Sequence, residues 1–365
     1  MRIAIDAVPL LVRSAGVKNY LYHWLTHMVR SAPRGTICSL PPLGELGPLN
    51  HDASMAGPVR TFAGLAALAA SNYTPLPILD WLTRSADVFH ASTLVRHPPR
   101  RPRLTATIYD MTCWLMPELH SAANLRADRA YCELLRRAHR LIAISQSSKD
   151  DAVRTLGLSP DGITVIYPGI ADAFFQPAPA AVQEVRTRYK LQRPFVLAVG
   201  TIEPRKNVDA LVKAFAALPA VMREEFDLVL AGPRGWASDE TNNLLRRVRY
   251  LGYIPEPDIA PLTAAAAMFA YPSLYEGFGF PVAQAMAAGT AVLASNVSSL
   301  PEITGDAALL IDPHSLSELT GGLHRLLSSP ALRAELAARG CVQASRFRWP
   351  DCAARSLEFF QEVAG

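Results

Sequence analysis

The sequence predicts an α/β protein with two doubly wound domains, each built on a parallel sheet. Short apolar runs alternate with helix-like stretches from Arg2 to about residue 167, and the same alternation restarts at Phe195. Strands that alternate with helices are typical of parallel sheets with right-handed crossovers. The 365 residues are also enough for two domains that each bury a core of their own.

In the first half, the apolar runs predict strands, and Gly16 opens a helix that continues to Val29. Ser147 and Ser148 are candidate N-caps for a helix that ends at Leu156. Residues 33–58 hold many Pro and Gly with little periodicity, so we expect a variable loop there. The expected strands are residues 2–5, 87–90, 104–109, 140–145 and 163–167.

A hinge-like stretch rich in Pro and Ala runs from Pro168 to Ala180, and it places the boundary between domains 1–170 and 171–349. The second half then predicts helices at 208–218, at 261–267 and at 282–288, and two amphipathic helices that close the chain. The expected strands are 195–199, 227–231, 250–254, 268–271, 291–294 and 308–311.

Composition narrows the class of protein. Half of the residues are hydrophobic, 19% are charged and the net charge is +4, which fits a globular protein and gives no argument for nucleic acid. Five cysteines without a C-x-x-C pair suit reduced thiols in a cytosol. Asp6 interrupts the N-terminus where a signal peptide would be apolar, and no apolar run reaches the roughly 20 residues of a membrane span.

One stretch, residues 271–289, has the chemistry of a binding site. An apolar strand ends at Tyr271, Gly277 and Gly279 form a turn, and Pro281 suits the first turn of a helix that Gly289 stops. A strand, a glycine turn and a helix N-terminus together form an anion site, most often for phosphate. The same pattern also occurs as a mere tight connection.

Glu276 stands at the lip of this turn. A carboxylate there accepts hydrogen bonds from hydroxyls, and phosphate beside hydroxyls describes a nucleotide sugar. Residues 200–207 and 232–236 also follow predicted strands, so they could face the same pocket at the carboxyl ends of the sheet. Spacing alone leaves a dehydrogenase or another nucleotide-binding protein open.

The chain resembles the retaining glycosyltransferases of family 4, above all the bacterial mannosyltransferases that build polysaccharide and O-antigen chains. The resemblance implies the GT-B fold, with two Rossmann-like domains facing a central cleft and the last helix, 350–365, crossing back to the first. The first domain would bind the acceptor and the second the nucleotide sugar. The segments that carry the resemblance are 87–91, 143–149, 199–207, 231–236, 271–284, 295–302 and 347–349.

The resemblance implies catalytic roles for three residues. Arg205 and Lys206 would hold the donor diphosphate, whose charge rises as the glycosidic C–O bond breaks. Glu276 would bind hydroxyls of the transferred sugar. The alternative for the Arg-Lys pair, taken by itself, is a solvated surface pair.

Further donor contacts follow from the same resemblance. The backbone of Gly277, Phe278, Gly279 and Phe280 would lie beside the sugar. Gln284 replaces the family's second Glu and would face the ribose, unless it is a packed helix residue. Gly252 and Tyr253 would meet the base, or serve packing alone. Gly16 matches a glycine that approaches the donor phosphate, and Lys18 adds charge.

Tyr109 and Asp110 correspond to the family's His-Asp pair on the side of the acceptor and the reacting sugar. Tyr109 replaces the His, so it can form hydrogen bonds but is not cationic near pH 7. We expect His90 to be a core residue rather than an acceptor contact. The arginines among prolines from His97 to Arg103 are either a solvated run or a contact with anionic lipid or a lipid-linked diphosphate.

The residues and the family resemblance together imply a cytoplasmic retaining transferase that moves a hexose to a growing and lipid-linked glycan, and the resemblance favours mannose from GDP-mannose. It would work without metal or cofactor, and it would contact the cytoplasmic face of the inner membrane. Two alternatives stay open: a sugar-nucleotide epimerase on the same fold, and a donor-binding protein that has lost catalysis.

Overall fold

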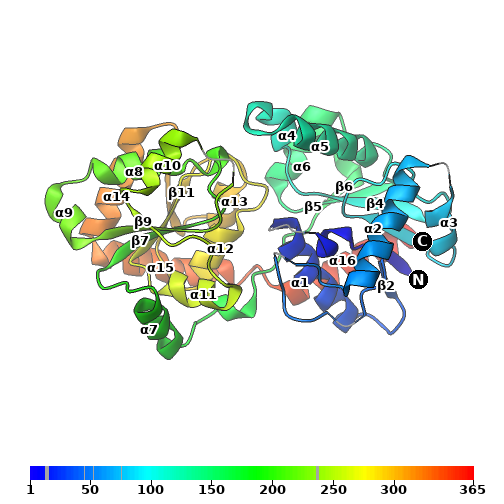
Figure 1. Cartoon of the computed structure of the whole chain (residues 1–365), viewed down its shortest axis with the longest axis horizontal. Helices are drawn as coiled ribbons and strands as arrows, with labels where there is room; N and C mark the ends of the chain where they lie inside the picture. The colour runs from blue at the N-terminus through cyan, green and yellow to red at the C-terminus, as the bar shows by residue number, and fades with distance from the viewer. Residues whose placement is uncertain (13–15, 45, 52, 75, 236–237) are drawn as a thin grey trace. The chain divides into compact units, whose positions relative to one another are not determined.

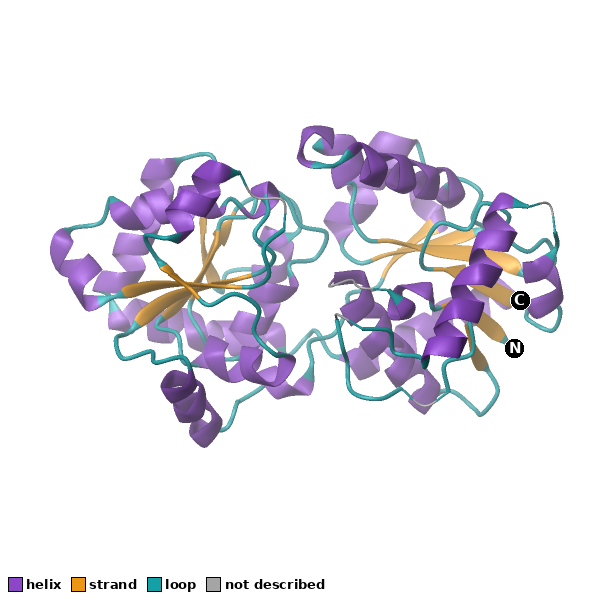
Figure 2. Cartoon of the chain, viewed as in Figure 1, coloured by secondary structure: helices purple, strands orange, loops and turns teal. Residues whose placement is uncertain are grey.

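A computed structural model describes the chain except residues 13–15, 45, 52, 75 and 236–237. The chain divides into two compact units (Figure 1). Unit 1 comprises Met1–Gly169 together with Arg348–Gly365, and unit 2 comprises Ile170–Phe347. Each unit is a parallel sheet with helices on both faces (Figure 2), as the alternating sequence pattern predicts.

Within the described residues, the sheet of unit 1 has six parallel strands in the order β2-β1-β3-β4-β5-β6. The strands are β1 (Ile3–Asp6), β2 (Ile37–Leu40), β3 (Val88–Ala91), β4 (Arg103–Ile108), β5 (Arg140–Ala143) and β6 (Ile163–Val165). The helices around them are α1 (Gly16–Ser31), α2 (Pro58–Tyr73), α3 (Ile78–Leu82), α4 (Thr112–Leu115), α5 (Ala122–Leu135), α6 (Gln146–Leu156) and α16 (Trp349–Ala364).

Two local predictions for unit 1 are wrong. Residues 33–58 are not all loop, because β2 pairs with β1 at the sheet edge. The strand has only four residues, all half-buried, between Gly35 and Pro41. So short a segment shows no clear alternation of apolar and polar residues. Ser145, and not Ser147 or Ser148, caps α6, since the Ser145 Oγ accepts a hydrogen bond from the Ser148 amide at 3.0 Å.

The last helix, α16, packs against α1 and so completes the core of unit 1, as expected from the family resemblance. The Trp24 Nε1 donates to the Ser356 Oγ at 2.8 Å, and the Phe360 ring lies 6.0 Å from that of Trp24. The crossing needs glycine at position 169, because a Cβ there would lie 2.1 Å from the Trp349 nitrogen.

Unit 2 has a second sheet that contains, in the described residues, six parallel strands in the order β12-β11-β10-β7-β8-β9. The strands are β7 (Phe195–Val199), β8 (Asp227–Ala231), β9 (Arg249–Tyr250), β10 (Met268–Tyr271), β11 (Val292–Ser295) and β12 (Ala308–Ile311). Numbered within the unit, this is the doubly wound order 3-2-1-4-5-6, in which the direction of winding reverses between β7 and β10.

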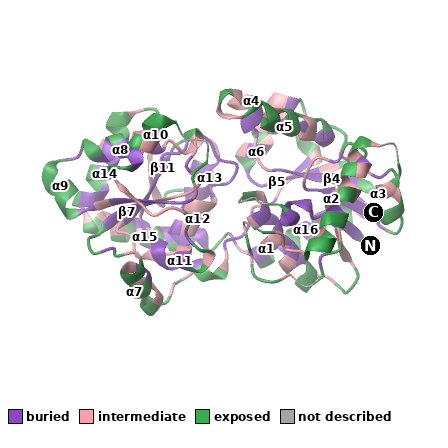
Figure 3. Ribbon diagram, in the orientation of Figure 1, coloured by how far each residue is buried: buried purple, intermediate pink, exposed green. Residues whose placement is uncertain are grey.

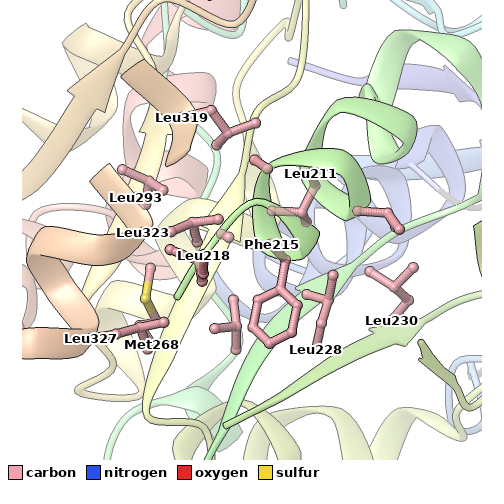
Figure 4. Close-up of a cluster of buried hydrophobic side chains, with 14 of the residues drawn as sticks. Leu211, Phe215, Leu218, Leu228, Leu230, Met268, Leu293, Leu319, Leu323 and Leu327 are labelled. Atoms are coloured by element: carbon pink, nitrogen blue, oxygen red, sulfur yellow. The ribbon is translucent and has the colours of Figure 1, made fainter. Parts of the chain in front are cut away.

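The helices of unit 2 lie on both faces of this sheet and leave the carboxyl ends of the strands to loops. They are α7 (Pro179–Arg188), α8 (Val208–Ala216), α9 (Ala220–Glu225), α10 (Asp239–Leu245), α11 (Glu256–Ala264), α12 (Phe280–Ala287), α13 (Leu300–Thr304), α14 (Leu316–Ser328) and α15 (Pro330–Ala344). Figure 4 shows the core on one face, where Leu211 and Phe215 of α8 and Leu323 of α14 pack with Leu228 of β8.

Two helix predictions for unit 2 need correction. The helix expected at 261–267 begins earlier, at Glu256, and carries Pro261 in its interior. A proline is tolerated in the first turn of a helix, and Pro257 occupies that place here. Pro261 lies further along the helix and does not mark its start. The chain ends in three helices where two were expected, because Ser329 caps α15 directly after α14.

Candidate active site

The catalytic and donor residues that are predicted in unit 2 lie at the carboxyl end of its sheet, where the winding reverses. β7 and β10 are neighbours there, so the loops that follow them meet. The Leu274 amide donates to the Arg205 carbonyl at 2.8 Å, and the Arg205 Nη1 donates to the Tyr275 carbonyl at 2.8 Å. A reversal of this kind is where open α/β sheets bind ligands.

Arg205, Lys206 and Glu276 form one ion-pair network in this place. The Lys206 Nζ lies 2.6 Å from the Glu276 Oε1, and the Arg205 Nη1 lies 3.1 Å from the same oxygen. The Arg205 Nη2 lies 2.7 Å from the Glu203 Oε1. The side chains of Arg205 and Lys206 are 20% and 12% exposed, so the two cations are not a solvated surface pair.

The network contains two cations and two carboxylates and is therefore neutral as a group. Burial raises the pKa of the Glu276 carboxyl, but the charges of Arg205 and Lys206 and the hydrogen bonds outweigh it and bring that pKa to about 2. Burial lowers the pKa of Lys206, and Glu276 opposes that shift. A diphosphate that reaches the pair must therefore compete with Glu276 for its cations.

Three further residues hold this network and were given no role by the sequence analysis. The Glu276 Oε1 also accepts hydrogen bonds from the Ser273 Oγ at 2.7 Å and the Tyr271 hydroxyl at 3.0 Å, and Glu203 pairs with Arg205 as described. Tyr271 and Ser273 lie in the stretch 271–289, where the sequence predicts only that a strand ends at Tyr271. No sequence spacing shows that their hydroxyls point to Glu276.

The turn after Glu276 has the geometry that its glycines predict. Gly279 has φ of +93°, and a Cβ on it would lie 2.6 Å from the Leu300 Cδ2. The Glu276 amide donates to the Ser298 Oγ at 2.8 Å, which fixes the start of the turn. Gly277 and Phe278 are buried within it, Phe280 is the first residue of α12, and Gln284 lies half-buried one turn further along that helix.

The other predicted loops of unit 2 adjoin the same edge. The Ile202 amide donates to the Pro233 carbonyl at 2.9 Å, and the Gly232 amide donates to the Gly252 carbonyl at 2.7 Å. Gly252 has φ of +70°, and the Tyr253 side chain beside it is 48% exposed. The loops after β7, β8 and β9 are thus joined by backbone bonds, while Trp236 lies outside the described residues.

Unit 1 holds the remaining predicted residues. Gly16 is the first residue of α1. Lys18 is fully buried, and its Nζ donates to the carbonyls of Val12 at 2.9 Å and Ala53 at 2.6 Å. These contacts give Lys18 a definite role in holding the loop after β1.

Tyr109 and Asp110 follow β4, at the carboxyl end of the unit 1 sheet. The Tyr109 hydroxyl is buried near the Ser92 and Thr107 side chains but forms no regular hydrogen bond among the described residues, and burial raises its pKa. The ring of Tyr20, on α1, lies 5.6 Å from that of Tyr109. The Asp110 Oδ1 accepts from the Thr112 amide at 3.1 Å and hydroxyl at 2.8 Å, which organises the start of α4.

His90 lies in the core, as expected. It is fully buried, and its two ring nitrogens lie 3.0 Å from the Thr105 and Thr107 hydroxyls. Burial lowers its pKa to about 3. His90 is therefore a neutral packing residue.

Among the described residues, no three His, Cys, Asp or Glu side chains gather in a way that could hold a metal ion. In the same part of the chain, no helix combines the length and the apolar character that crossing a membrane would require.

Comparison with known proteins identifies the family. Residues 183–341 match the family described as Glycosyl transferases group 1, and residues 15–174 match Glycosyltransferase Family 4. The chain is 34% identical over 272 residues to O-antigen chain mannosyltransferase B of Escherichia coli, a match that covers 72% of this chain and 71% of that relative. The chain belongs to glycosyltransferase family 4.

Other relatives agree with this assignment. The mannosyltransferase WbdA of Escherichia coli is 30% identical over 237 residues, which cover 62% of this chain and 29% of WbdA. Among solved structures, HepE of Anabaena in complex with UDP and glucose has a TM-score of 0.72 at 20% identity, with 99% of both chains covered. WaaG, a glycosyltransferase of lipopolysaccharide biosynthesis, has a TM-score of 0.69 at 17% identity, with 98% of this chain and 99% of WaaG covered. The GT-B fold and the hexosyltransferase class of this family 4 chain are thereby confirmed.

Proposed function

We propose that the chain is a retaining mannosyltransferase that uses GDP-mannose and extends a lipid-linked glycan. The names of its Escherichia coli relatives support mannose as the sugar and an O-antigen chain as the type of product. The observation that carries the proposal is the buried network of Arg205, Lys206 and Glu276 at the reversal point of the unit 2 sheet.

In the proposed mechanism, the cations of this network meet the donor diphosphate. The C–O bond between the sugar and the phosphate breaks, and negative charge rises on the leaving oxygen. Glu203 and Glu276 hold Arg205 and Lys206 in place, so the two cations are already positioned to stabilise that charge once the diphosphate displaces part of their contact with Glu276. Glu276 exchanges part of its cation contact for hydroxyls of the sugar.

The acceptor hydroxyl attacks the sugar on the face that the diphosphate leaves, and a phosphate oxygen takes its proton. The bond formed therefore keeps the anomeric configuration of the donor. The backbone of Gly277 to Phe280 and the N-terminus of α12 lie beside the network and suit the sugar and phosphate. We assign Gln284 to the ribose and Gly252 and Tyr253 to the base.

In unit 1, we assign Tyr109 and Asp110 to the side of the acceptor and the reacting sugar. The support for Tyr109 is its buried hydroxyl, which forms no regular hydrogen bond among the described residues. We assign Gly16 and Lys18 to the donor phosphate, with Lys18 acting through the loop that its ammonium holds. The acceptor itself is proposed to be lipid-linked, with the enzyme at the cytoplasmic face of the membrane.

Replacing Arg205 or Lys206 by Ala tests the assignment. Losing one placed charge donor costs about 3 to 4 kcal/mol in the transition state, so turnover falls by two orders of magnitude or more. Lys213→Ala is the matched control, because Lys213 pairs with Glu240 on the surface of the same unit. Steady-state release of GDP from GDP-mannose gives the readout, and circular dichroism confirms the fold. Near-normal turnover in both single variants would contradict the proposed donor site.

A further inference from the structure

The surface helix α2 lacks the polar outer face that a soluble helix normally has. No Asp, Glu, Lys, Arg or His occurs from Thr61 to Leu79. Only Gly64 and Ser71 of α2 are buried, and Figure 3 shows the rest of α2 as exposed or intermediate. Surface helices ordinarily carry charged residues opposite their apolar stripe. The exposed side of α2 therefore has the composition of a surface that contacts an apolar partner.

Large apolar side chains gather on the same two helices and the turn between them. Phe62 is 77% exposed, Tyr73 is 78% exposed and Trp81 is 65% exposed. Val59, Leu76 and Leu82 are exposed as well. Single exposed apolar residues are ordinary, but several large ones on two helices that contact each other indicate an interaction site.

Arginines lie beside these apolar side chains. Two of them place their guanidinium groups over exposed aromatic rings, and a third donates a hydrogen bond to the backbone of its neighbour. The Arg84 guanidinium lies 5.8 Å from the Trp81 ring centroid, and that of Arg96 lies 5.5 Å from the Tyr73 centroid. The Arg101 Nη1 donates to the Arg84 carbonyl at 2.9 Å. We name the exposed side chains of residues 58–84 together with Arg96, Arg100 and Arg101 the α2–α3 face.

The arginine-rich loop is fixed against the helices. The Arg96 amide donates to the Asn72 Oδ1 at 2.8 Å, and the Asn72 Nδ2 donates to the Leu94 carbonyl at 3.2 Å. The Arg100 amide donates to the Asp80 Oδ1 at 2.7 Å. Apolar rings and cations are thus presented together by one ordered surface.

The net charge of residues 58–103 indicates what kind of partner the α2–α3 face binds. Residues 58–103 contain six arginines and two aspartates, a net charge of +4, which equals the net charge of the whole chain. The rest of the chain is therefore neutral in sum. Two copies of this face would repel one another, whereas an anionic surface would attract it.

We propose that the α2–α3 face docks on a lipid bilayer with anionic headgroups. Its aromatic and aliphatic side chains enter the boundary between headgroups and acyl chains, and its arginines contact the lipid phosphates. An apolar helix bordered by cations and aromatic rings is the chemistry by which helices lie in a membrane interface. The proposal extends the lipid-linked acceptor of the proposed function, but its test does not depend on turnover.

Vesicle binding by the full chain tests this docking. We expect the protein to sediment with phosphatidylcholine vesicles that contain phosphatidylglycerol, more weakly at high salt, and hardly with pure phosphatidylcholine. The fluorescence of exposed Trp81 should shift to shorter wavelength on binding. The double variant Phe62→Ser, Trp81→Ser should lose binding, and Arg84→Ser or Arg101→Ser should each weaken it about fivefold.

Matched controls separate docking from general damage. Val221→Ser changes a side chain that is 73% exposed on unit 2, and it should bind vesicles as the wild type does. All variants should keep transfer to a water-soluble acceptor, which also separates failure of docking from failure of the proposed function. No binding to anionic vesicles, equal binding by the double variant, or self-association through Phe62 and Trp81 in place of vesicle binding would each overturn the proposal.

Discussion

At the scale of single residues, the central finding is that Glu276 pairs with the two cations that we assign to the donor diphosphate. Its Oε1 lies within hydrogen-bond distance of the Lys206 Nζ, the Ser273 Oγ and the Tyr271 hydroxyl. Glu276 therefore offsets part of the charge of the same cations that should hold a diphosphate. This pairing keeps Arg205 and Lys206 in one geometry and lowers the cost of burying them.

Glu276→Gln should show how far the carboxylate charge of Glu276 stabilises the fold and how far it serves the donor. The variant keeps the shape but leaves two nearly buried cations without their shared carboxylate, so the free energy of unfolding should fall by about 3 kcal/mol. A bound diphosphate can replace the lost charge. GDP should therefore raise the melting temperature of the variant more than that of the wild type, while turnover of GDP-mannose falls. Equal loss of affinity for GDP and for GDP-mannose would contradict this role of Glu276.

Gln284 tests the ribose assignment. Its amide can accept from one ribose hydroxyl and donate to the other oxygen, and the family's Glu would offer a charged acceptor in their place. We expect Gln284→Glu to change donor affinity by no more than about tenfold, or 1.4 kcal/mol. Calorimetric titration with GDP-mannose and its 2′-deoxyribose analogue gives the measurement. If the wild type binds both alike and Gln284→Ala changes neither affinity, Gln284 is no ribose ligand.

At the scale of elements, the turn before α12 depends on Gly279. Its φ of +93° disfavours any side chain, and a Cβ would press on the Leu300 side chain. Gly279→Ala should lower the free energy of unfolding by about 2 kcal/mol and weaken donor binding. Gly321→Ala is the control, since its Cβ meets no atom within 4 Å and should stabilise helix α14 by up to about 1 kcal/mol. Urea unfolding measures both. A neutral Gly279→Ala would show that the turn is not rigid.

The sequence predicts most elements because apolar runs and helix periods are local signals. β8 and β12 have the predicted bounds, and β10 ends at Tyr271 as expected. The sequence did not predict β2, because an edge strand of four half-buried residues has no clear alternation of apolar and polar residues. Contacts between distant parts of the chain could not be predicted either. No local pattern shows that Tyr271, Ser273 and Glu203 hold the network. Nor does one show that Lys18 donates to the Ala53 carbonyl.

At the scale of the whole molecule, two doubly wound units divide the chemistry of the chain. Unit 2 carries the neutral ion-pair network at the reversal point of its sheet. Unit 1 carries Tyr109 and Asp110 at its own sheet end, and also the basic α2–α3 face. Because α16 closes the core of unit 1 after the chain has built unit 2, both ends of the polypeptide belong to one unit.

The most direct test of the account is to follow GDP-mannose by NMR in the presence of the wild-type protein alone. The account predicts slow release of GDP, with free mannose appearing first in the anomeric configuration of the donor, and loss of this activity in Lys206→Ala. Formation of an epimeric nucleotide sugar, release of the opposite anomer, or tight binding of GDP-mannose without any turnover would contradict it.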